Sequence, residues 1–417
     1  MRHCVKPSLA GHFLSVLLLA VSTLGQGSEN LRRLYTERSW FELRESVAAS
    51  NSDLFYRGVT SCAFGQKISC ERDLRSVIKL DPRSQRAYDA HEELGYLYFR
   101  SGDYRRALTE IEAQLVIKPD KASLRSGQEL LLALSKNPPL SVERPVTTTV
   151  KYEIFEGGLF LPIEINGQSA NYFADSGMNI SLVTESEAKR LKLRIVDSAS
   201  DAKLVGNAGG GIGFRVGVAD KFDIGGLRLK NVPFLIVSDD RPPFGDMPAS
   251  RRGGIGLPVM MAFGKMQWDK TNRFQITPTA TNTLAANPNI CFDQGLPLLD
   301  AFVAGKRVHL ILDTGAEGTE LYPLFAKDLE SFVSRSGDRS KTQVNGLDGS
   351  KDVEAIMLPE FPIRIGNTSK VLKSIPVFQK QTASDSQNLH HGNLGLDVLR
   401  TADVVTLDLR SMRLTLR

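Results

Sequence analysis

The C-terminal two-thirds of the chain carries the same order of sequence elements twice, and this duplication constrains the fold more than any other feature. Each copy has an apolar run, an Asp-hydroxyl-Gly tripeptide, a Gly-bearing hairpin, an apolar-Gly pair and a closing apolar run. The first copy contains YFADSGMNISLV and the second contains LILDTGAEGTELY. Short β-prone runs between Gly, Asn and Asp turns are typical of all-β folds. The sequence therefore predicts two similar β lobes, over residues 150–280 and 288–417.

Each copy presents one carboxyl group at the end of an apolar strand. The glycine of the tripeptide permits a tight turn, and the hydroxyl group can hydrogen-bond across to the partner loop. Two carboxyl groups about 3 Å apart cannot both ionise readily, so they share one proton. The ionised group can activate a water molecule while the protonated group polarises a carbonyl. We therefore expect a catalytic pair, Asp175 and Asp313, supported by Ser176, Gly177, Thr314 and Gly315.

These motifs resemble those of aspartic peptidases of the retropepsin and pepsin type. The stretch DSGMNISLVTESEAKRLKL is similar to the bacterial retropepsin-like pattern, and DTGAEGTELYPLFAKDL is its counterpart. Ile255-Gly256 and Leu394-Gly395 resemble the apolar-Gly pair that packs beneath each catalytic loop. The resemblance covers about residues 150–417. It implies a bilobal acid-protease fold and aspartic endopeptidase activity on peptides or proteins, with no cofactor and no metal.

Two alternatives to this interpretation stay open. Retropepsins assemble their site from two chains, whereas pepsins, like this sequence, carry both halves in one chain. The lobes could also form a non-catalytic peptide-binding module on a degenerate fold. Met178 favours that alternative, because the family usually has a smaller residue at this position.

Departures from the family pattern concern the flap and the pKa of the pair. The Gly-rich run VGNAGGGIGFRVG contains no Tyr, the residue that pepsins place in their flap. The candidate flap, within residues 206–214, is formed by Gly209, Gly210, Gly211 and Phe214. Neither tripeptide is followed by Ser or Thr. Because one hydrogen bond that lowers the pKa of the pair is then missing, we expect activity nearer neutral pH than that of pepsins.

Residues 31–136 show the three- and four-residue apolar spacing of helices. The run AYDAHEELGYLYFRSGDYRRALTEIEAQLVIKP resembles one tetratricopeptide unit, with Gly95, Ala107 and Pro119 at its twelve-residue steps. A weaker copy lies upstream, and a generic helical bundle is the alternative. Such repeats offer a surface for a protein partner. The three prolines of NPPLSVERPVTTT, residues 137–149, indicate a linker. The predicted fold class is therefore multidomain, with all-α hairpins followed by an all-β bilobal part.

The first 27 residues are typical of a signal peptide, because a basic start precedes a short apolar stretch. They predict a periplasmic or secreted protein with no membrane span in the mature chain; an uncleaved anchor is the alternative. In an oxidising compartment Cys62 and Cys70 can form a disulfide, although two unpaired thiols fit the sequence equally well. The net charge of +5 includes no long basic run, so nucleic acid is not an expected partner. His390 and His391 are expected in a solvated loop.

Overall fold

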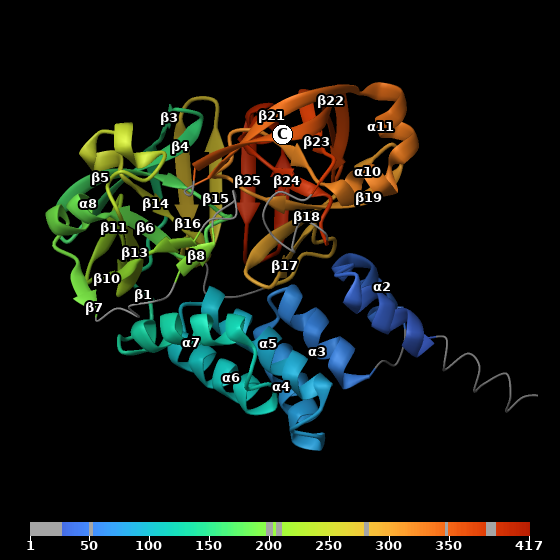
Figure 1. The fold of residues 1–417 in the computed structure, drawn as a ribbon. Helices are drawn as coiled ribbons and strands as arrows, with labels where there is room; N and C mark the ends of the chain where they lie inside the picture. Colours follow the sequence, from blue (N-terminus) through green and yellow to red (C-terminus); the bar gives the residue numbers. More distant parts are fainter. Residues whose placement is uncertain are drawn as a thin grey trace, which may run out of the picture.

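The N-terminal part of the chain is helical and forms a layer beneath the β-rich remainder (Figure 1). The computed structural model describes residues 27–49, 53–196, 203–205, 211–278, 283–346, 349–380 and 389–417. Most of the predicted signal peptide, residues 1–26, lies outside these ranges. Residues 27–36 are helical. They are followed by α2 (Trp40–Ala49), α3 (Leu54–Ala63), α4 (Lys67–Leu80), α5 (Gln85–Arg100), α6 (Tyr104–Ile117) and α7 (Ala122–Ser135).

Side-chain caps start several of these helices, and each helix packs on the next. Asp53 and Ser84 accept hydrogen bonds from backbone N–H groups in the first turns of α3 and α5. A Cβ atom at Gly58 would overlap Leu74, so the glycine allows α3 and α4 to approach closely. A disulfide between Cys62 and Cys70 joins the same two helices. Within the described part of the chain, no helix is long and apolar enough to cross a membrane.

The β-rich part begins earlier than the sequence predicted. Within the predicted linker 137–149, β1 (Ser141–Arg144) pairs with β12 (Leu227–Lys230). The segment β2 (Thr148–Lys151) pairs with β16 (Arg273–Thr277). The prolines precede or separate these strands, and the β-branched residues between them join the sheets. The linker prediction therefore needs correction, because this segment is integrated into the β sheets.

The two halves place equivalent strands in equivalent pairings. In the first half, β5 (Gln168–Ala174) pairs in parallel with β14 (Gly253–Ile255), which pairs antiparallel with β6 (Ser181–Thr184). In the second half, β19 (Lys306–Leu312) pairs in parallel with β24 (Gly392–Leu394), which pairs antiparallel with β20 (Glu320–Leu321). Their sheet orders are β1-β12-β11-β4-β5-β14-β6-β13-β10-β7 and β17-β18-β19-β24-β20-β23-β22-β21.

The remaining elements complete these sheets and cover their faces. The first half also contains β3 (Glu153–Phe155), β4 (Gly158–Ile165), α8 (Glu185–Arg190), β7 (Arg194–Val196), β10 (Arg215–Ala219), β11 (Phe222–Ile224), β13 (Val232–Val237) and α9 (Leu257–Phe263). The second contains β17 (Ile290–Asp293), β18 (Leu296–Val303), α10 (Pro323–Asp328), α11 (Glu330–Ser336), β21 (Asp338–Gly346), β22 (Gly349–Ile365), β23 (Thr368–Phe378) and α12 (Leu396–Arg400). The predicted order, a helical part followed by a β-rich part, is confirmed.

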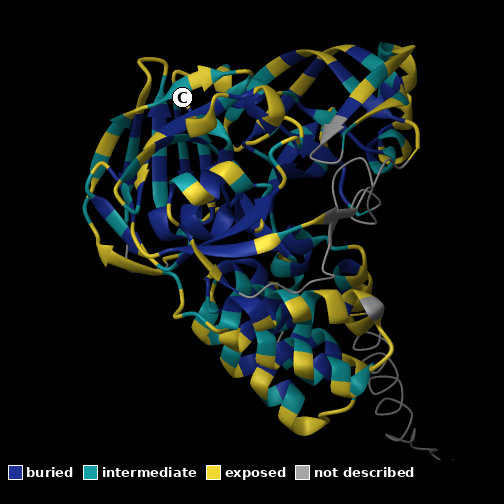
Figure 2. Ribbon diagram, turned by 60° about the vertical axis from the view of Figure 1, so that its left-hand side comes forward, coloured by how far each residue is buried: buried dark blue, intermediate teal, exposed yellow. Residues whose placement is uncertain are grey.

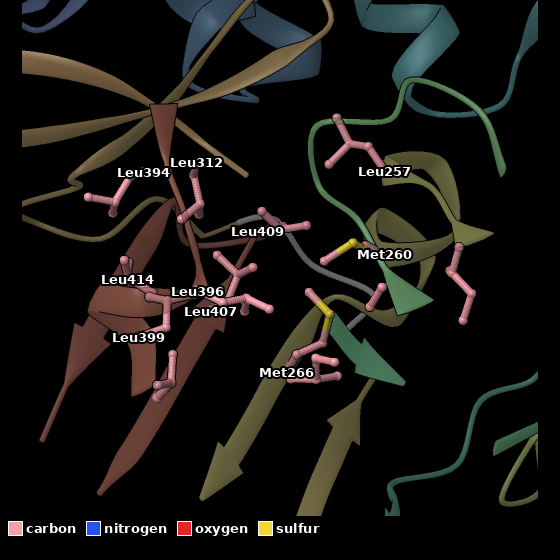
Figure 3. Packing of buried hydrophobic residues seen from close by; sticks show 14 of the residues in the cluster. Leu257, Met260, Met266, Leu312, Leu394, Leu396, Leu399, Leu407, Leu409 and Leu414 are labelled. Carbon is pink, nitrogen blue, oxygen red and sulfur yellow. The ribbon is translucent and has the colours of Figure 1, made fainter. Parts of the chain in front are cut away.

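A third sheet joins the two halves. Its order is β2-β16-β15-β25-β26, with β15 (Lys265–Asp269) from the first half paired to β25 (Val404–Asp408) from the second. The last strand is β26 (Arg413–Leu416). Apolar side chains of both halves meet above it: Figure 3 shows Leu257 and Met260 on one side and Leu312 and Leu394 on the other. Many of the buried strand residues, dark blue in Figure 2, belong to one apolar cluster that contains residues of both halves.

The helical layer contacts both halves. It touches α9 through α5, and β17 through α2 and α3. The buried guanidinium group of Arg100 donates a 2.7 Å hydrogen bond to the backbone oxygen of Gln294. It also lies 4.4 Å from the ring centre of Phe292. Because Gln294 belongs to the turn between β17 and β18, the helices brace a turn of the second half.

Candidate active site

Asp175 and Asp313 lie directly after β5 and β19, where the two halves meet. Their backbone N–H groups donate to Ile255 and Leu394, at 2.9 and 3.0 Å, which anchors both loops to the neighbouring apolar-Gly pairs. A Cβ atom at Gly177 would lie 2.9 Å from the Asp313 Cγ, and a Cβ atom at Gly315 would overlap the Asp175 carboxyl group. Each glycine therefore makes room for the aspartate of the other half, and the two carboxyl groups meet within one chain.

The Ser and Thr of the two tripeptides lock the loops together. The Ser176 hydroxyl donates to the Leu312 carbonyl at 2.6 Å and accepts from the Thr314 N–H at 3.0 Å. In the same way, the Thr314 hydroxyl donates to the Ala174 carbonyl at 2.8 Å and accepts from the Ser176 N–H at 3.0 Å. Both residues are buried. These four reciprocal bonds satisfy buried backbone groups of both strands and fix the separation of the two aspartates.

The hydrogen bonds to the two carboxyl groups are unequal. Asp175 accepts from the Gly177 N–H at 2.8 Å. Asp313 accepts at Oδ1 from the N–H groups of Gly315 and Ala316, at 2.9 and 3.1 Å. Its Oδ2 accepts from the Asn393 side-chain amide at 2.8 Å. Asn393 is a site residue that the motifs alone do not predict. A comparison of the two copies could have identified it, because GNLG in the second copy aligns with GGIG in the first, so that an asparagine replaces a glycine beside the apolar-Gly pair.

The environment raises the pKa of two carboxyl groups at this site. Burial raises the pKa of Asp175 well above its usual range, and the charge of Asp313 and a hydrogen bond to it act in the same direction. Burial, followed by the charge of Asp313, raises the pKa of Glu320 on β20 to about 7. A close pair of carboxyl groups, one of which holds a proton, supports acid–base chemistry on water.

These raised pKa values predict how stability depends on pH. A carboxyl group with a raised folded pKa stabilises the protein below its unfolded pKa and loses that contribution as pH rises to the folded pKa. For Glu320 this range runs from about 4.5 to about 7. We expect Glu320→Gln to flatten the fall of the unfolding free energy over this range by up to about 3 kcal/mol. Urea denaturation across the range measures this; identical pH profiles for both proteins would contradict it.

Met178 does not occupy the space between the two aspartates. Its terminal methyl would lie 2.6 Å from a Cβ atom at Gly254, so the side chain rests on that glycine. Its backbone oxygen accepts from the Leu257 N–H at 2.8 Å. Ala316 and Asn393 hold the equivalent positions in the second half. A glycine on the neighbouring strand therefore makes room for the larger side chain at this position.

The residues after each motif also reach the opposite half. Glu317 lies against Gly157, where a Cβ atom would be 2.6 Å from the Glu317 Cδ. Asn179 lies against Gly295 in the same way, since a Cβ atom there would overlap its amide. Gly157 has a φ of +74°, which favours glycine. Each aspartate-bearing loop thus contacts a hairpin of the other half.

The flap candidates are only partly covered by the structure. Gly209 and Gly210 lie outside the described residues. Gly211 begins β9 (Gly211–Gly213), which pairs with β8 (Lys203–Val205) as a two-stranded sheet. Phe214 follows and packs, partly buried, against the apolar core. A flap role for these residues stays a prediction.

His390 and His391 are buried, which corrects the expectation of a solvated loop. His390 Nε2 lies 3.2 Å from the Asp293 carboxyl group. His391 Nδ1 accepts a 3.0 Å hydrogen bond from the backbone of His309. Asp293 and His309 are distant from the two histidines in the sequence, and they provide the polar contacts that water would provide in an exposed loop. Among the described residues, no group of three or more His, Cys, Asp or Glu side chains could hold a metal ion.

Comparisons with known proteins bear on the first half. Residues 161–259, which include the first aspartate motif and its apolar-Gly pair, match the protein family described as aspartyl protease. No curated protein matches the chain. Among solved structures, a retropepsin-like aspartic protease from Rickettsia conorii is similar at 13% identity and a TM-score of 0.22. The similarity covers 33% of this chain and 93% of that protein. An aspartyl-protease-type segment therefore surrounds Asp175.

Proposed function

We propose that this chain is an aspartic endopeptidase that hydrolyses peptide bonds with a water molecule activated between Asp175 and Asp313. The observation that carries the proposal is the close pair itself, in which each motif's glycine makes room for the other motif's carboxyl group. The aspartyl protease match around Asp175 supports it. The second half supplies the equivalent strand, motif and apolar-Gly pair.

In the proposed reaction, the water oxygen bonds to the peptide carbonyl carbon. One proton of the water passes to the ionised carboxylate, while the protonated carboxyl group gives its proton to the carbonyl oxygen. The resulting diol is neutral. It collapses when the C–N bond breaks, the first carboxyl group protonates the departing nitrogen, and a diol proton returns to the second. The buried hydroxyl bonds of Ser176 and Thr314 hold both carboxyl groups in place throughout.

The test compares a peptide with its analogue in which a tetrahedral hydroxyl-bearing carbon replaces the scissile carbonyl. A catalytic site binds the transition-state mimic at least about 100-fold more tightly than the peptide, and a mere binding module does not. We expect this preference in calorimetric titration of the wild type and its loss in Asp175→Asn and Asp313→Asn. Equal affinities for peptide and analogue in the wild type would favour the binding module.

We further propose an exported protein whose helical part is a tetratricopeptide-like layer that can receive a protein partner. The Cys62–Cys70 disulfide supports export, because disulfides persist mainly in oxidising compartments. Successive packing of α3 through α7 supports the repeat assignment. The peptide or protein substrate would bind at the two aspartates.

A further inference from the structure

Close to the aspartates, the two halves differ at one pair of neighbouring equivalent positions. In the first half, Gly254 leaves room for the Met178 side chain. In the second half, Asn393 replaces the glycine and Ala316 replaces the methionine. The Asn393 side chain is therefore free to reach Asp313, to which it donates a 2.8 Å hydrogen bond. Since Asn393 is 7% exposed, this bond is shielded from water.

As a consequence, the carboxyl group of Asp313 accepts more hydrogen bonds than that of Asp175. Asp313 accepts from two backbone N–H groups and one side-chain amide. Asp175 accepts a hydrogen bond from the Gly177 N–H. Backbone hydrogen bonds from Gly177 and Met178 lower the pKa of Asp175, but burial raises it by more. A neutral amide donor stabilises the ionised form of its acceptor. The titratable groups that face Asp313 are Asp175, across the loop, and Glu320, on β20, and the charge of Asp313 raises the pKa of both.

We propose that Asn393 is a positioning residue that sets the protonation order of the pair. It holds Asp313 as the ionised group that takes the proton from water. Asp175 is then the group that holds the shared proton and gives it to the carbonyl oxygen. This assignment rests on the proposed function and adds to it the role of each aspartate. Asn393 gives Asp313 the kind of donor that a following Ser or Thr would provide, whereas the equivalent position beside Asp175 is Gly254, which has no side chain.

The test removes the coupling between the aspartates, so that Asp313 titrates alone. Protein labelled with ¹³C at the aspartate carboxyl carbon is titrated by NMR as Asp175→Asn and as Asp175→Asn with Asn393→Leu. Leucine has the same branched side-chain shape, although it is larger, and it has no donor. We expect the pKa of Asp313 to rise by about one unit in the double variant. An unchanged pKa would overturn the proposal.

Two further variants keep the result interpretable. Asn289→Leu removes another buried asparagine of the second half, which bonds the Leu414 backbone, and should leave the Asp313 pKa unchanged. If Asn393→Leu fails to fold, Asn393→Gly restores the residue of the first half and should produce the same shift. Because this titration needs no catalysis, it separates a wrong role for Asn393 from a wrong function. In an active enzyme, Asn393→Leu should also move the acidic limb of the kcat/KM profile upward by about one pH unit.

Discussion

Asp175→Asn and Asp313→Asn should each lower peptide cleavage by about 1,000-fold or more, while the fold stays intact. Asparagine keeps the shape of aspartate but can neither hold nor release the proton that the reaction moves. Loss of one acid–base group typically costs 10²- to 10⁴-fold in rate. Each variant keeps the Ser176 and Thr314 bonds, so substrate positioning should survive. Initial rates on a cleaved peptide, measured beside circular dichroism spectra, provide the test.

The same substitution at Asp175 should not destabilise the protein at pH 7. Burial and the neighbouring Asp313 raise the pKa of Asp175, so its ionised form is unfavourable in the folded state. A neutral amide avoids that cost and can still accept from the Gly177 N–H. Thermal unfolding measures this effect. A large loss of stability in Asp175→Asn would mean that the carboxyl group has a structural role, and any loss of activity would then say little about catalysis.

Removal of the Arg38 guanidinium group should produce the largest loss of stability among single substitutions at the contact between the helical layer and the second half. Arg38 donates to Glu93 at 2.9 Å and lies 3.5 Å from Asp293. Both carboxyl groups are almost completely buried. Although burial opposes it, the hydrogen bond from His390 and the charge of Arg38 keep the pKa of Asp293 below its usual range.

Arg38→Met should therefore lower the free energy of unfolding by about 3–5 kcal/mol, the usual cost of leaving buried charges without a partner. Arg33→Met is the matched control. Arg33 pairs with Glu37 on the surface, where both side chains are at least half exposed, so the loss should be below about 1 kcal/mol. Urea denaturation at pH 7 compares the two. Equal losses would show that the buried network contributes little.

Local sequence patterns predicted that the two aspartates would meet, because each aspartate lies in a short contiguous motif. Short β-prone runs such as Leu159–Ile165, Val232–Val237, Val308–Leu312 and Val404–Leu407 lie within β4, β13, β19 and β25. Each is a β-branched or aliphatic run between turns, so local propensity and burial favour the same structure. The tripeptides follow two equivalent strands, and the duplication implied that their ends would meet.

Asn393 and the histidines were missed for a physical reason. In GNLG, the apolar-Gly pair Leu394-Gly395 is the recognisable motif. The hydrogen bond from Asn393 to Asp313 becomes apparent only when this position is compared with its equivalent in the first half, Gly254. His390 and His391 looked solvated because their partners, Asp293 and His309, are distant in sequence. The contact of the helical layer, through Arg38 and Arg100, depends on buried charges that a sequence pattern does not distinguish from surface charges.

Incubation of the purified protein with a mixed peptide library from pH 3 to 8, with the cut sites identified by mass spectrometry, tests whether the two aspartates catalyse peptide hydrolysis. We expect internal cleavage by the wild type, with a maximum above about pH 4, that disappears in both Asp175→Asn and Asp313→Asn. A folded wild-type protein that cuts no peptide at any pH, or cleavage that survives either substitution, would contradict it.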